Sequence, residues 1–168
     1  AFDGVNERRV RNDLEPTKWN GDLAYVARLY SQEMIDKQFF GHESPEGEFH
    51  DERLHENGIY YYNKSAENLA SINYVLSYSY VVETGKVLNV TYKSLDDVVF
   101  AAVDGWINSS GHYRNIMDAD FDESGMGVIY DEINESFMFT HIFIRRTNCG
   151  YYGASCCHTE GYLPWCYV

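Results

Sequence analysis

The chain has few basic residues: 13 lysines and arginines stand against 26 aspartates and glutamates in 168 residues, a formal net charge of −13. Phosphate binding needs a basic face, so this composition excludes nucleic acid as a partner. The same acidity disfavours docking to anionic lipid. No run of about 18 apolar residues occurs, so no transmembrane helix is predicted. With 45% hydrophobic and 16% aromatic residues, the chain can bury the core of one domain.

Cysteine is absent from the first 148 residues, and all four cysteines lie in the last 20: Cys149, Cys156, Cys157 and Cys166. An even number in one tail predicts a disulfide-stapled extension over residues 147–168, with the pairing left open. A bond between the adjacent Cys156 and Cys157 is the least favoured pairing because it is strained. Zinc bound with His158 is the alternative, although the spacing lacks two CxxC pairs. Disulfides predict a secreted or extracellular surface protein.

Four glycosylation sequons agree with that location: Asn63, Asn89, Asn108 and Asn134. Each triplet is short enough to occur by chance, so an unmodified asparagine is the alternative at every one. We expect glycans at Asn63, Asn89 and Asn134. Asn108 lies beside the candidate site described below and is the least suited to carry a glycan.

Hydrophobic spacing and capping residues predict an α+β chain. We expect helices over residues 6–12, 20–34, 51–57 and 94–106, and strands over residues 124–130 and 136–146. Both alternating sets of the last strand are rich in apolar residues, which predicts cover on both faces and favours a core or edge histidine over a ligand at His141. Trp106 is expected in the core.

Residues 72–92 stand apart from this pattern. Two segments rich in β-branched and aromatic residues, 78–83 and 87–92, flank Thr84-Gly85-Lys86, which predicts an inserted hairpin. The hairpin has two alternative roles. It either covers the core, or it presents a strand edge for self-association through residues 78–92.

Two histidines and a glutamate lie in three distant segments, each flanked by turn residues. His42 lies in the loop of residues 39–47, Glu67 lies between alanine and asparagine in a second loop, and His112 follows a helix at a helix-loop junction. We expect these three side chains to form one polar site.

The segments that carry these residues resemble those of the CAP superfamily, which includes cysteine-rich secretory proteins, insect antigen 5 and plant pathogenesis-related proteins. Residues 41–47 (GHESPEG), 66–70 (AENLA) and 106–116 (WINSSGHYRNI) are similar to SHxSPDG, GENIA and WMNSPGHRxNI of its prokaryotic SCP-like branch. Residues 6–9 (NERR) and 14–20 (LEPTKWN) are similar to HNxxR and PLxW(N/D), with Val5 in place of the histidine. The resemblance implies a three-layer α-β-α sandwich with a small antiparallel sheet over residues 1–146.

The resemblance also implies a cleft that contains His42, Glu67 and His112, with Ser109 where animal members have a second acidic residue. Two imidazoles can hold a divalent cation such as zinc, with Glu67 orienting one ring from behind. Alternatively, the polar cluster only ties loops together. Calcium at residues 118–124 is less favoured, because Glu123 occupies the position where an EF-hand needs glycine.

Three functions follow. The favoured one is a non-enzymatic extracellular binding module for a metal, lipid or glycan. The second is a self-assembling structural or adhesive surface protein. The third is a His/Glu-dependent hydrolase such as a peptidase. It lacks a clear nucleophile, since turn and cap roles explain Ser109 and Ser110.

Overall fold

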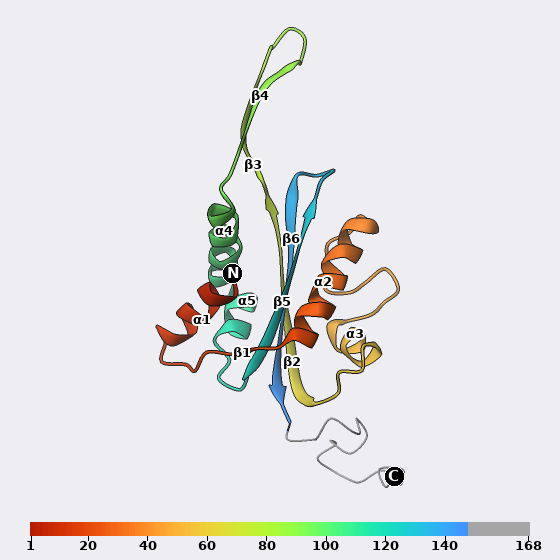
Figure 1. Ribbon diagram of the computed structural model, residues 1–168, viewed down its shortest axis with the longest axis vertical. Helices are drawn as coiled ribbons and strands as arrows, with labels where there is room; N and C mark the ends of the chain where they lie inside the picture. Colours follow the sequence, from red (N-terminus) through yellow and green to blue (C-terminus); the bar gives the residue numbers. More distant parts are fainter. Residues whose placement is uncertain (148–168) are drawn as a thin grey trace.

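A computed structural model of the chain describes residues 1–147 and has three layers (Figure 1). The middle layer is a four-stranded sheet in the order β1-β5-β6-β2. Helices α1, α4 and α5 lie on one side of it, and α2 and α3 lie on the other. The helices are α1 (Phe2–Val10), α2 (Gly21–Asp36), α3 (His50–Glu56), α4 (Leu95–Asn108) and α5 (Ser110–Ile116). The strands are β1 (Lys18–Trp19), β2 (Tyr62–Asn73), β3 (Val75–Tyr80), β4 (Val87–Tyr92), β5 (Glu123–Asp131) and β6 (Ser136–Arg146).

This architecture confirms the α+β sandwich. The sheet is antiparallel across β2, β6 and β5, whereas the two-residue β1 pairs with β5 in parallel. Two predictions lie outside the described residues. They are the disulfides, at Cys149, Cys156, Cys157 and Cys166, and the extension over residues 147–168 apart from Thr147.

Helix caps and close packing position the two helical layers. The Asn20 side chain accepts hydrogen bonds from the first turn of α2, and Ser94 and Asp97 form the capping box that starts α4. Helix α2 packs directly on β5 because Gly125 and Gly127 lack side chains. A Cβ at Gly127 would meet the backbone of Ala27 and Arg28.

The strand β6 is covered on both faces, as expected, and forms the centre of the core. His141 is fully buried on it, and its Nε2 lies 2.9 Å from the Ser124 hydroxyl. Complete burial lowers the pKa of His141 to about 3, so the ring is neutral at neutral pH. Trp106 is also buried, and its indole N–H donates to the Leu69 carbonyl at 2.8 Å. Both residues are therefore core residues, as predicted.

Three sequence-based boundaries were wrong. Glu67 lies near the middle of the long strand β2 rather than in a loop, because residues 62–73 pair with β6. His112 lies in a short helix, α5, rather than at a helix-loop junction. The first helix starts at Phe2 rather than Asn6. Its buried Arg9 donates to the carbonyls of Glu15, Ile116, Asp118 and Phe121, which fixes α1 against the turn before β5.

The hairpin is present, and β3 and β4 form their own two-stranded sheet. It projects beyond the end of the sandwich as a long arm (Figure 1). Its base is held by Tyr74, which stacks on Tyr92 at 5.0 Å and contacts Phe137 edge-on at 5.2 Å. The arm itself is exposed, so it does not cover the core.

Candidate functional site

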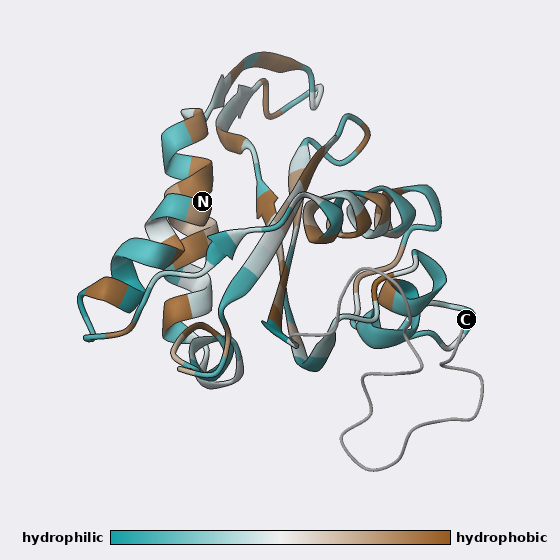
Figure 2. Cartoon of the chain, turned by 60° about the horizontal axis from the view of Figure 1, so that its bottom comes forward, coloured by the Kyte–Doolittle hydropathy of each residue, from teal (hydrophilic) through white to brown (hydrophobic). Residues whose placement is uncertain are grey.

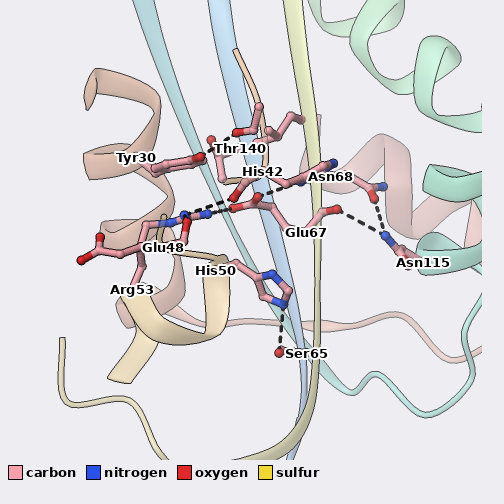
Figure 3. A network of polar contacts seen from close by, with 12 residues as sticks. Tyr30, His42, Glu48, His50, Arg53, Ser65, Glu67, Asn68, Asn115 and Thr140 are labelled. Carbon is pink, nitrogen blue, oxygen red and sulfur yellow. Dashed lines mark hydrogen bonds and ion pairs between the residues drawn. The ribbon is translucent and has the colours of Figure 1, made fainter. Parts of the chain in front are cut away.

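The buried carboxylate of Glu67 is the centre of the candidate site (Figure 3). Its side chain is 1% exposed and projects from β2 toward α3 and the loop that follows α2. One oxygen lies 2.9 Å from His42 Nδ1, and the other accepts from Arg53 Nη2 at 2.8 Å. A buried carboxylate needs such partners, because an unpaired charge in the core is costly.

Arg53 supplies the positive charge that balances Glu67. Its side chain is 6% exposed, and Nη1 also donates to the carbonyls of Glu48 and His42. The guanidinium lies 3.3 Å above the Tyr30 ring, a contact that favours a cation over an aromatic face. Tyr30 in turn donates to the Gly41 carbonyl at 2.6 Å, and burial raises its pKa to about 12. Together these contacts fix the loop that carries His42.

His42 is held on one side and open on the other. Its side chain is 47% exposed, although Glu67 contacts Nδ1. Because a carboxylate accepts a hydrogen bond, this contact favours the tautomer with the proton on Nδ1. The lone pair on Nε2 is then the one available to a ligand.

His112 lies in α5, and its ring neighbours that of His42. Its ring centroid lies 6.3 Å from that of His42, with the planes tilted by 56°. Asn68 Nδ2 donates to the His112 carbonyl, and Asn115 donates to the Asn68 side chain and to the Glu67 carbonyl. Partial burial and the neighbouring His42 lower the pKa of His112, which favours a neutral imidazole.

The structure therefore brings together the three residues expected from sequence. Ser109 lies at the junction of α4 and α5, half-buried, and its side chain makes no capping hydrogen bond. Within residues 1–147, no three histidine, cysteine, aspartate or glutamate side chains are grouped as a ready metal site. A cation in this cleft would have two imidazole ligands and otherwise water or a bound molecule.

Sequence reasoning missed Arg53, Tyr30 and His50. His50 Nε2 lies 3.0 Å from Ser65 Oγ below Glu67, and burial lowers its pKa (Figure 3). The available signal for Arg53 was its position beside the apolar Leu54 in a short helix. That position favours burial, and a buried arginine needs an acidic partner. Nothing in the local sequence distinguishes His50 from a surface residue.

Other candidate residues lie away from the cleft. In the segment proposed for calcium, Asp118 and Asp120 pair with Lys64 at 2.6 and 2.8 Å. The sequon residues Asn63, Asn89, Asn108 and Asn134 are all exposed. Asn134 Nδ2 donates to Asp131, and Asn108 Nδ2 donates to Asp104. Glycosylation stays a prediction at each position.

The fold and the polar site define a class of protein: an α-β-α sandwich that brings together two histidines and a glutamate paired with a buried arginine. The sequence model of the cysteine-rich secretory protein family matches residues 2–143. The chain therefore belongs to the cysteine-rich secretory protein (CAP) family, which confirms the resemblance found in its motifs.

Three of the similar proteins come from bacteria. An extracellular protein of Bacillus anthracis that contains an SCP domain is 28% identical, with a TM-score of 0.64, over 86% of this chain and 39% of that one. The uncharacterised membrane protein YlbC of Bacillus subtilis is 28% identical over 145 residues, 86% of this chain and 33% of that protein. An outer surface protein of Borrelia burgdorferi shares the fold at 20% identity and a TM-score of 0.65, over 87% and 90% of the two chains.

The chain thus spans about a third of the length of YlbC. Two of its structural neighbours are described as extracellular or outer-surface proteins. Among the described residues, no helix is both long and apolar enough to cross a membrane.

Proposed function

We propose that this chain is a secreted, non-enzymatic binding module whose cleft holds a divalent metal, zinc, between His42 Nε2 and His112. Glu67 orients the His42 ring from behind. The observation that carries the proposal is the His42–Glu67 contact, which occupies Nδ1 and leaves Nε2 for a ligand, with the His112 ring 6.3 Å away. Histidines that bind metal commonly donate their second ring N–H to a carboxylate.

Distances in the cleft agree with this role. Two imidazoles on one zinc ion, each bonded at about 2.0–2.1 Å, have ring centroids roughly 5–6 Å apart. The separation of 6.3 Å between the His42 and His112 rings needs only a small inward movement of one side chain. His42 is the more exposed of the two and is able to make that movement.

The charges in the cleft indicate what a bound metal would attract. Glu67 is already paired with Arg53, so its negative charge is balanced within the protein. Both ligands are imidazoles, which carry no charge when they bind metal. The metal would therefore keep its full positive charge, which favours an anionic group, such as a carboxylate of the bound molecule, in the open position.

Calorimetric titration of zinc into the full chain, with its disulfides kept oxidised, tests the proposal. We expect one site in the wild type and loss of that site in His42→Ala and in His112→Ala. His55→Ala is the matched control, because His55 is an exposed histidine stacked between Tyr60 and Tyr62, away from the cleft. Equal zinc binding by both cleft variants and the wild type would refute the metal site.

The hydrolase alternative has less support. Neither Ser109 nor Ser110 makes a hydrogen bond to His112 among the contacts of residues 1–147, and such a bond is the feature that would support a serine nucleophile. Turnover of peptides or esters that disappears in Glu67→Gln, while the variant stays folded, would restore this alternative.

A second function is favoured by the exposed arm: self-association through residues 78–92. Tyr78, Tyr80 and Leu88 are each more than half exposed, which is unusual for apolar side chains that lie close together. Light scattering from the purified full chain tests this proposal. A strictly monomeric protein at high concentration would refute it.

A further inference from the structure

The arm has one apolar face and one polar face. The side chains of directly paired residues point to the same face. Tyr78 and Val90 are one such pair, and Tyr80 and Val87 form the next pair on this face, beyond a bulge. The rings of Tyr78 and Tyr80 are 5.8 Å apart on that face. Hydrophilic side chains occupy the opposite face: Ser77, Ser79, Asn89 and Thr91. The colouring in Figure 2 shows brown stretches in this hairpin although it lies outside the core.

This two-faced pattern is typical of a strand pair with one covered face, yet nothing in residues 1–147 covers it. The apolar face includes Tyr78, 63% exposed, and the bulge residue Leu88, also 63% exposed. Glu83 and Lys86 are the only charged residues of the arm and cancel each other, whereas the whole chain carries −13. The arm is therefore the part of the molecule that a second, equally acidic copy can approach without repulsion. The sequon at Asn89 lies on the polar face, so a glycan there leaves the apolar face open.

The same molecule has an uncovered apolar groove. It lies between α1, α4 and β5 and has a volume of about 330 Å³. Trp19, Leu95 and Val128 line it and are exposed. Among the described residues, no charged side chain lines this groove, which makes it suitable for an apolar strand.

The groove borders a free sheet edge. Strand β1 pairs with β5 only at Glu123 and Ser124, and β5 has no other neighbour on that side among the described residues. The backbone N–H of Asn20 donates to the Ser124 carbonyl, so the backbone groups of Ser124 point toward this edge of β5. Backbone groups of a strand alternate in direction from one residue to the next. Those of Met126, Val128 and Tyr130 therefore also point to this edge, where a further strand can pair.

We propose that the arm of one copy adds to the β5 edge of a second copy and places its apolar face in the neighbouring groove. This inference rests on the self-association proposed above and names the surface that receives the arm. Strand addition supplies backbone hydrogen bonds, and the groove supplies burial for alternate side chains. Both partners are present on every molecule, so no other protein is required.

The areas involved indicate a reciprocal dimer. The exposed side chains of this face are 52–63% exposed: Tyr78, Tyr80, Val87 and Leu88. At about 150–250 Å² for a large side chain, these fractions give the apolar face of the arm about 400 Å² of accessible surface. One arm in one groove then buries about 800 Å² in total, half of the roughly 1,600 Å² of a standard stable interface. Two reciprocal contacts reach that area. The expected species is a symmetric dimer that exchanges its arms.

Light scattering of the full chain over a concentration series, with matched variants, tests the proposal. We expect a dimer that weakens at least tenfold in Tyr78→Ser/Tyr80→Ser on the arm and in Leu95→Glu/Val128→Glu in the groove. Ser79→Lys, on the polar face, and Leu29→Glu, an exposed leucine of α2, are controls that should leave the dimer unchanged. Thermal unfolding should show that all four variants remain folded, because each substitution is on the surface.

The outcomes separate the two proposals. A wild type that is monomeric at every concentration refutes self-association itself. A dimer that is lost in the arm variant but kept in the groove variant refutes only the receiving surface. A dimer that is kept in both refutes the role of the arm.

Crosslinking identifies the receiving surface directly. The photoreactive p-benzoylphenylalanine replaces Tyr80 in a mixture of isotopically labelled and unlabelled chains. We expect mixed-isotope crosslinks to peptides that contain Val128 or residues 95–99. Crosslinks that join only hairpin to hairpin, or none in a sample that scatters as a dimer, would overturn the proposal.

Discussion

Replacing Glu67 with glutamine removes one negative charge from the centre of the cleft and preserves the shape of the side chain. The amide oxygen can still accept from Arg53. The amide nitrogen, however, cannot accept from His42 Nδ1, so the ring loses the partner that sets its tautomer. Because Glu67 and Arg53 are both buried, Glu67→Gln leaves the guanidinium charge without its counter-ion.

The size of the effect follows from these contacts. Removing one partner of a buried ion pair costs about 3–5 kcal/mol, and the remaining neutral hydrogen bond recovers about 1 kcal/mol. We therefore expect the free energy of unfolding to fall by about 2–4 kcal/mol. For a domain of this size, that lowers Tm by roughly 5–15 °C. Loss of the group that orients a metal-binding histidine lowers zinc affinity by about 10–100-fold.

Two assays measure the two effects separately. Thermal unfolding without metal gives the stability change, and zinc titration well below Tm gives the change in affinity. Glu46→Gln is the matched control, because within residues 1–147 this exposed carboxylate pairs only with Lys37 and makes no contact with His42, Glu67 or His112. It should change neither quantity. A Glu67→Gln protein with the wild-type Tm and wild-type zinc affinity would refute the reasoning.

Two further predictions concern the core. The pKa of His141 is about 3 when folded and 6.5 as an unperturbed group, so below pH 6.5 the unfolded state binds the proton more readily. The free energy of unfolding should therefore fall by up to about 1.4 kcal/mol for each unit that the pH drops between pH 6.5 and about pH 3. His141→Phe should flatten this acid dependence in denaturant titrations, and parallel curves would contradict it. Gly127→Ala should destabilise the protein by about 3 kcal/mol or more in urea unfolding, because its Cβ meets the α2 backbone. Gly105→Ala, in α4 with open space around it, should stabilise by about 1 kcal/mol. Equal effects of the two glycine substitutions would contradict the packing argument.

The sandwich could be predicted where local and global signals agree. Helix α4 has its capping box at Ser94 and its apolar stripe ending at Trp106, and both features are visible in the sequence. The hairpin was predicted from its β-branched segments around Gly85, whose φ of +67° favours glycine. In these segments the residue pattern alone specifies the element.

Strand β2 could not be predicted because its side chains serve the cleft. Ser65, Glu67 and Asn68 have low strand propensity, and they are kept in place by pairing with β6 and by contacts to His50, Arg53 and Asn115. Such conflicts between local preference and final structure are expected at functional sites. Arg53 was missed for a similar reason, since its partner lies 14 residues away and only the fold brings the two together.

Zinc X-ray absorption on the metal-loaded full chain identifies the atoms bound to the metal and therefore tests the site at His42 and His112. We expect a shell of nitrogen and oxygen atoms at about 2.0–2.1 Å with the multiple scattering of two imidazoles. We also expect this imidazole signal to disappear when His42 and His112 are both replaced by alanine. A sulfur shell at about 2.3 Å, unaffected by those substitutions, would place the metal on cysteines instead and contradict the account.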